Sequence, residues 1–204
     1  MEWVEAVKER TQGQVVAIDG KQLRRSGDKR LGKNAIYMVS AWASENGLVL
    51  GQTKVDDSSN EITAIPRLLD MLEVSGCIVT TDAMGCQTAI AKKVIENEAD
   101  YMFVVKENQG QLYETLRDLF ENPDEMRWVD CDYHKTVEKD HGRIEIREGW
   151  TTSDPEYLQY ISRRGNWEGL KSIAVIQTER RIGPETRTSR RYFISSLESN
   201  AKKL

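Results

Sequence analysis

The sequence predicts a mixed α/β fold built around one sheet, and two observations carry this prediction. The first is a pair of short apolar runs that each end on an aspartate, VVAID at 15–19 and CIVTTD at 77–82. The second is the order of the patterns: three strands, then helix, strand, helix and strand. Helices that alternate with strands favour parallel pairing, whereas strands joined by tight turns favour antiparallel pairing.

The first half of the chain supplies the elements of this sheet. The hairpin expected between the second and third strands has Asn46 and Gly47 at its turn, and Asn60 is a suitable N-cap for the helix after it. The expected elements are a helix at 2–10, a strand at 15–19, a basic loop at 20–34, strands at 35–44 and 47–56, a helix at 60–74, a strand at 77–82, a helix at 86–99 and a strand at 101–106.

The pattern changes after residue 106. A helix at 110–122 leads into stretches of period-2 alternation at 128–150, 171–180 and 190–197, which are typical of half-buried strands. We therefore expect two parts: a catalytic core at 1–106, and a helix with a β-rich insertion at 107–204.

The composition sets limits on function. The 204 residues carry a net charge of −4, and 39% of them are hydrophobic, which suits an ordinary globular fold. No apolar run approaches the roughly 20 residues of a membrane span, so we expect no membrane association. The three cysteines form no CxxC pair, which speaks against a disulfide framework or a zinc site. A reducing cytoplasm is the simplest expected compartment.

Three antiparallel strands followed by helix-separated parallel strands is the order of an RNase H-like core. Its first and fourth strands are neighbours, so Asp19 and Asp82 are expected to meet at one sheet edge. A lone aspartate after a strand more often opens a turn or caps a helix, but the repetition favours a shared site. Two close carboxylates repel unless a cation lies between them, and oxygen ligands suit Mg²⁺ or Mn²⁺.

Cations crowd directly behind Asp19. A charge run is usually a solvated face, but beside a carboxylate pair we expect it to hold a phosphate backbone. Lys106, at the end of a predicted strand, is a further candidate for a phosphate contact. The candidates behind Asp19 are Lys21, Arg24 and Arg25.

A charged strand in the insertion offers a third candidate acid. His141, Arg143, Glu145 and Arg147 alternate in sequence, so they share one strand face. Two interpretations stay open. The face is either a salt-bridged solvent surface, or a surface that contacts DNA or the rim of the active site, with Glu145 as a catalytic acid.

Several motifs together resemble the DDE insertion-sequence transposases that include the H-repeat-associated proteins. They are VVAIDGKQLRRS, CIVTTDAMGCQTAIAKKVIENEADYMFVVKENQGQLYE, HGRIEIR and RRYFISSL. The resemblance implies an RNase H-like catalytic domain whose first two acids are Asp19 and Asp82. It further implies cleavage and transfer of strands at transposon-end DNA, with two Mg²⁺ or Mn²⁺ ions.

The same resemblance implies that this sequence is the central part of such a transposase. Family members usually begin with a further domain and continue past RRYFISSL into a helix that carries the third acid. We therefore expect this chain to bind a divalent ion weakly at Asp19 and Asp82 and to show little strand transfer. Self-association is a further expectation. Two alternative functions stay open: a catalytically incomplete DNA-binding remnant, and another metal-dependent nuclease on the same core.

Overall fold

The computed structural model describes residues 13–24, 26, 36–45, 47–55, 60–122, 126, 129–140 and 142–204. The chain splits into two compact units, Met1–Phe103 and Val104–Leu204. The helix expected at 2–10, most of the basic loop expected at 20–34, and the candidates Arg25 and His141 lie outside the described residues.

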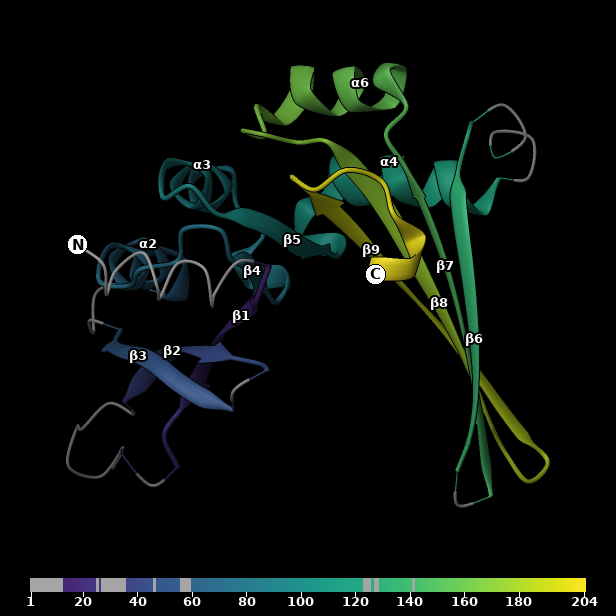
Figure 1. Ribbon diagram of the computed structural model, residues 1–204, viewed down its shortest axis with the longest axis horizontal. Coiled ribbons are helices and arrows are strands. Elements are labelled where there is room, and N and C mark those ends of the chain that lie inside the picture. The colour runs from purple at the N-terminus through teal and green to yellow at the C-terminus, as the bar shows by residue number, and fades with distance from the viewer. Residues whose placement is uncertain are drawn as a thin grey trace. The chain divides into compact units, whose positions relative to one another are not determined.

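The first unit contains the predicted mixed sheet (Figure 1). Within the described residues its strand order is β3-β2-β1-β4-β5. β1 pairs with β2 and β2 with β3 in antiparallel fashion, whereas β1–β4 and β4–β5 are parallel pairs. This order confirms the predicted RNase H-like core, with the first and fourth strands as neighbours. The strands are β1 (Val15–Gln22), β2 (Tyr37–Ala43), β3 (Leu48–Lys54), β4 (Ile78–Thr81) and β5 (Asp100–Val105).

β1 is longer than predicted. We expected the strand to end at Asp19, with a loop from residue 20, but β1 continues to Gln22. It continues because this part of β1 still pairs with β2, where Asp19 lies opposite Ser40. On its other side, the register with β4 ends at the pair Ile18 and Thr81. Asp19 therefore lies within a strand, at the point where β4 stops flanking it.

Two helices, α2 (Glu61–Asp70) and α3 (Thr88–Glu96), complete the core of the first unit. The predicted N-cap of α2 is confirmed, because the side chain of Asn60 accepts a hydrogen bond from the Thr63 N–H. α2 packs against β2, β3 and α3. Leu68 and Leu69 on this helix are fully buried, and burial of each such side chain contributes about 1.5–3 kcal/mol.

In its described residues, the second unit is a long antiparallel ladder with two α-helices (Figure 1). Its strand order in the described residues is β9-β8-β7-β6, and the period-2 stretches of the sequence account for it. No helix in the described part of either unit is long and apolar enough to cross a membrane. The elements are α4 (Gly110–Glu121), β6 (Asp132–Asp140), β7 (Arg143–Thr152), α6 (Pro155–Gly165), β8 (Ser172–Ile182) and β9 (Glu185–Ser195).

α6 was not expected from the sequence. Its sequence, PEYLQYISRRG, is mostly polar, and it buries only Ile161 among its residues. Its boundary signals are clear, however. The Asp154 side chain accepts hydrogen bonds from the first-turn N–H groups, Pro155 stands at the first helical position, and Asn166 ends the helix in the left-handed region at φ 45°.

The ladder is buried at one end and exposed at the other. Ile173 and Ile194 are fully buried where β8 and β9 begin and end, respectively. By contrast, every residue from Arg180 to Arg191 is exposed, around a turn at Gly183 with φ 55°. The exposed end of β8 is paired with the first residues of β7 on one side and with β9 on the other. One end of the sheet is thus packed, and the other presents charged side chains to solvent.

Candidate active site and nucleic-acid interface

Asp19 and Asp82 occupy matching positions on neighbouring parallel strands. The β1–β4 register ends at Ile18 and Thr81, and the two aspartates are the next residues along the chain, Asp19 within β1 and Asp82 just after β4. Both side chains are exposed at this edge of the sheet. The strand pairing therefore brings together the two acids that the sequence singled out.

Asp82 also has the structural role that a lone aspartate usually has. Its Oδ1 accepts hydrogen bonds from the N–H groups of Met84 at 3.0 Å and Gly85 at 3.3 Å, which caps the short helix η2 (Ala83–Gly85). Gly85 is required for this turn, because a Cβ there would lie 2.6 Å from the Cβ of Thr81. The turn holds the Asp82 carboxylate in place, and both hydrogen bonds use the same oxygen.

Asp19 has a cation as its immediate neighbour. The Lys21 Nζ lies 3.2 Å from Asp19 Oδ2, and their side chains are 79% and 53% exposed, respectively. The two residues are two positions apart on β1, so they share a face. An ion pair this exposed contributes little to stability, and Lys21 remains able to leave Asp19 for another anion.

A third carboxylate, which sequence reasoning missed, lies close enough to both aspartates to feel their charges. Glu61 is the first residue of α2. Burial is the main cause that raises the pKa of the Glu61 carboxyl, and the charges of Asp82 and Asp19 raise it further. Glu61 also lies directly against β1, since a Cβ at Gly20 would be 2.2 Å from the Glu61 Cδ. Three acids from three elements therefore meet at this edge.

The strand directions explain why Glu61 is there. β1 and β4 are parallel, and β3 runs the same way as β1 because two antiparallel pairings separate them. The carboxyl ends of β1, β3 and β4 consequently lie at one edge. Because α2 starts after β3, its first turn begins at this edge too. In the sequence, an acid after the N-cap Asn60 looks like an ordinary complement to the helix dipole.

The three acids are suited to a hard divalent cation, although their side chains are not arranged as a finished cage. In the part of the chain that is described, no group of three or more His, Cys, Asp or Glu is arranged to hold a metal ion. The charges of Asp82 and Asp19 nevertheless raise the pKa of Glu61. Exposed side chains change rotamer within nanoseconds, so these carboxylates are able to turn toward a common cation. A cation among these oxygens would relieve the repulsion that raises the Glu61 pKa.

Glu145 lies in the second unit and has a different environment. It sits on β7, and its side chain is only 7% exposed. Its Oε1 contacts Arg147, and its Oε2 lies 3.4 Å from Arg180 and 3.6 Å from Arg143. Burial raises the pKa of Glu145, but the three guanidinium groups outweigh burial and lower it overall. This geometry favours the ion-paired interpretation of the strand, with its central acid buried rather than exposed.

The other predicted contacts to DNA are cations that the structure leaves at the surface. Lys21 and Arg24 follow Asp19 on or after β1, and Lys106 directly follows β5. Arg143 and Arg147 flank Glu145 and are each 44% exposed. These five side chains are accessible, as phosphate contacts must be.

The strand order of the first unit and its acidic edge define the RNase H-like class of folds. Comparison with known proteins gives the family. The pattern of the family described as "Transposase DDE domain" matches residues 10–204. The chain belongs to this DDE transposase family, as the sequence motifs predicted.

Relatives from Escherichia coli agree with this assignment. The chain is 44% identical over 193 residues to "Putative protein YbfL" of strain K12, and 43% identical over 193 residues to "H repeat-associated putative transposase YhhI" of the same strain. Each alignment covers 93% of this chain and 50% of the relative. "Putative transposase YncI" of strain O157:H7 is 41% identical over 206 residues, which cover 99% of this chain and 52% of that protein. The chain thus spans about half the length of these relatives.

Proposed function

We propose that this chain carries the metal-binding acids of a transposase centre that cleaves and transfers DNA strands. The observation that carries the proposal is the β1–β4 register, which makes Asp19 and Asp82 neighbours at one sheet edge. Membership of the DDE transposase family supports it. In this proposal Asp19 and Asp82 are the first two catalytic acids and the ligands of Mg²⁺ or Mn²⁺.

Each residue at the edge has a distinct task. Asp82 supplies a carboxylate that is already oriented by its hydrogen bonds to Met84 and Gly85. Glu61 adds a third negative charge beside the two aspartates. Divalent ions bound there would neutralise phosphate charge and activate the attacking oxygen. Lys21 and Arg24 would hold the backbone of the DNA next to the reacting phosphate.

The contacts of Glu145 speak against its use as the third catalytic acid. Its two carboxylate oxygens are engaged with Arg143, Arg147 and Arg180, and a metal ion would have to displace these cations. We therefore propose a metal site without Glu145. A catalytically incomplete DNA-binding protein is the second candidate function, and the ion-paired state of Glu145 is the observation that favours it.

Metal binding is the first test. The 204-residue chain would be titrated with Mn²⁺, and electron paramagnetic resonance would measure the free ion at each step. The titration should show one weak site. Asp19→Asn and Asp82→Asn should each weaken binding at least about tenfold, whereas Glu145→Gln should leave it unchanged. Equal affinity in the wild type and in both aspartate variants would overturn the proposed site.

Strand cleavage is the second test. Duplex DNA with the element's inverted repeats, and the same DNA with scrambled ends, would be incubated with the chain and Mn²⁺. A preference for the repeat ends that requires Asp19 and Asp82 supports the transposase centre. Little turnover with intact DNA binding supports the second candidate. Robust cleavage that Glu145→Gln abolishes would make Glu145 a metal ligand and contradict our exclusion of it.

A further inference from the structure

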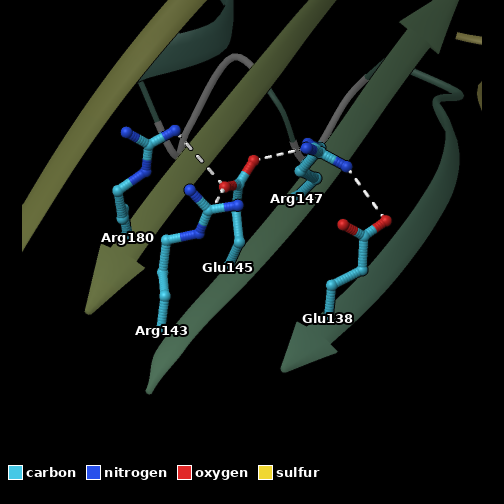
Figure 2. A network of polar contacts seen from close by, with 5 residues as sticks. All are labelled: Glu138, Arg143, Glu145, Arg147 and Arg180. Atoms are coloured by element: carbon cyan, nitrogen blue, oxygen red, sulfur yellow. Dashed lines mark hydrogen bonds and ion pairs between the residues drawn. The ribbon is translucent and has the colours of Figure 1, made fainter. Parts of the chain in front are cut away.

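Glu145 is surrounded by three arginines from two strands, and we call these four residues the hub (Figure 2). Arg143 and Arg147 stand two residues before and after it on β7, and Arg180 is its partner in the β7–β8 register. All three guanidinium groups point to the one carboxylate. Neighbouring strands lie about 4.8 Å apart, so a single carboxylate can reach cations on both.

The hub combines a buried anion with accessible cations. The Glu145 side chain is 7% exposed, whereas those of Arg143, Arg147 and Arg180 are 44%, 44% and 48% exposed. A guanidinium carries five N–H donors, and a contact with one carboxylate oxygen engages only part of them. The three guanidinium groups thus stay accessible to solvent while the carboxylate between them is buried.

The three arginines are not equivalent. Glu138 on β6 lies opposite Glu145 in the register, and Arg147 bridges the two acids, with its Nη1 3.1 Å from Glu138 Oε1 (Figure 2). Arg147 therefore has two anionic neighbours. Arg143 and Arg180 contact the same oxygen, Oε2 of Glu145, so each of them shares its anion with the other. Arg143 also lies opposite Asp140 in the β6–β7 register, but its ion pair is with Glu145. Arg143 and Arg180 are therefore the pair best able to bind a further anion.

We infer that the hub is a docking surface for the phosphate backbone of DNA, in which Glu145 positions Arg143 and Arg180 as the contacting residues. This inference deepens the proposed function, on which it rests for the choice of DNA as the polyanion. Guanidinium forks match the geometry of phosphate oxygens, and arginines fixed in advance lose less side-chain entropy on binding. Glu145 is a positioning residue here and makes no contact with DNA itself.

Removal of Glu145 or of Glu138 distinguishes this role from simple electrostatics. Both are acids on the same face, so a purely electrostatic surface would bind DNA more tightly after either substitution. The positioning role predicts opposite signs. Glu138→Gln should tighten binding about twofold to threefold, because it removes an exposed charge. Glu145→Gln should weaken binding about threefold to tenfold, and Glu145→Asp, which keeps the charge, should recover part of the loss.

The salt dependence of binding gives a second, independent measurement. Fluorescence anisotropy with labelled duplex DNA in EDTA yields the slope of log K against log salt, which falls by about 0.9 for each lost phosphate contact. Arg143→Ala and Arg180→Ala should each lower the slope by about this amount, and Arg147→Ala by clearly less. Arg181→Ala is the matched control, since Arg181 is 50% exposed and adjacent to Arg180, on the opposite face of β8.

The outcomes separate this inference from the proposed function. Two results would overturn the docking surface and leave the proposed function intact. One is tighter DNA binding by Glu145→Gln. The other is a salt slope that Arg143→Ala and Arg180→Ala leave unchanged while both variants still bind DNA. The absence of any salt-dependent DNA binding by the wild-type chain would count against the proposed function as well. If Glu145→Gln fails to fold by circular dichroism, the two arginine variants still decide the docking surface.

Discussion

Gly20 and Glu61 are in direct contact: a Cβ on Gly20 would lie 2.2 Å from the carboxyl carbon of Glu61. Gly20 follows Asp19 on β1, and Glu61 opens α2. The missing side chain of Gly20 therefore makes room for the third acid at the edge that holds Asp19 and Asp82. Substitutions at this edge should therefore change metal binding, stability and the pH dependence of stability.

Gly20→Ala should impair metal binding more than folding. The added methyl group collides only with the end of a flexible side chain, so Glu61 can rotate away at a cost of about 1 kcal/mol or less. Its carboxylate then leaves Asp19 and Asp82, and we expect a loss in Mn²⁺ affinity of about tenfold, within the range known for outer-shell partners. Thermal unfolding and Mn²⁺ titration check this. A large loss of stability with unchanged affinity would contradict it.

Glu61→Gln should stabilise the metal-free protein at neutral pH. The folded pKa of Glu61 is raised above its ordinary value of 4.5, so the ionised group opposes folding as the pH rises past that value. The gain should be small, because the burial of Glu61 is only partial and solvent screens the charges of Asp82 and Asp19. It should vanish below pH 4, where the acid is protonated in both states. Urea unfolding at pH 4 and pH 7, with and without Mn²⁺, measures the difference, and Mn²⁺ should stabilise the variant less than the wild type.

Two substitutions at Asp82 should distinguish its role as a helix cap from its role as a negatively charged metal ligand. Asparagine is nearly as good a cap as aspartate, so Asp82→Asn should keep the hydrogen bonds to Met84 and Gly85 and change stability by less than about 0.5 kcal/mol. Asp82→Ala loses the cap and should cost about 1 kcal/mol. Both should lose Mn²⁺ binding. Chemical denaturation of the three proteins decides the point, and equal stability of the two variants would show that the cap is dispensable.

Glu145 should make the protein sensitive to acid. Its guanidinium neighbours hold the folded pKa below the ordinary value of 4.5, so the group contributes stability above that value and loses it as the pH falls through the folded pKa. The wild type should therefore lose stability below about pH 4.5 more steeply than Glu145→Gln. Arg147→Ala should flatten the profile in part, because it removes the main attractive partner. Parallel profiles from pH 6 to pH 3 would rule out this contribution.

Much of the fold follows from local signals. The cap at Asn60 and the apolar face of α2 are short-range patterns. The placement of β1 beside β4 follows from the order of the elements, which is that of an RNase H-like core. The length of β1 is not local, because the residues after Asp19 stay in the strand through pairing with β2. α6 was missed because its sequence is mostly polar, although Asp154 and Pro155 mark its start.

The sequence by itself determined the family, the strand order and the two aspartates that follow the β1–β4 register, because motifs and periodicity are properties of consecutive residues. Only the tertiary structure decided that Glu61 joins these aspartates and that Glu145 is surrounded by arginines. Both depend on which strand directions and registers bring distant residues together. Glu61 meets Asp19 because β1 and β3 run the same way, and Glu145 meets Arg180 because one register between β7 and β8 makes them neighbours.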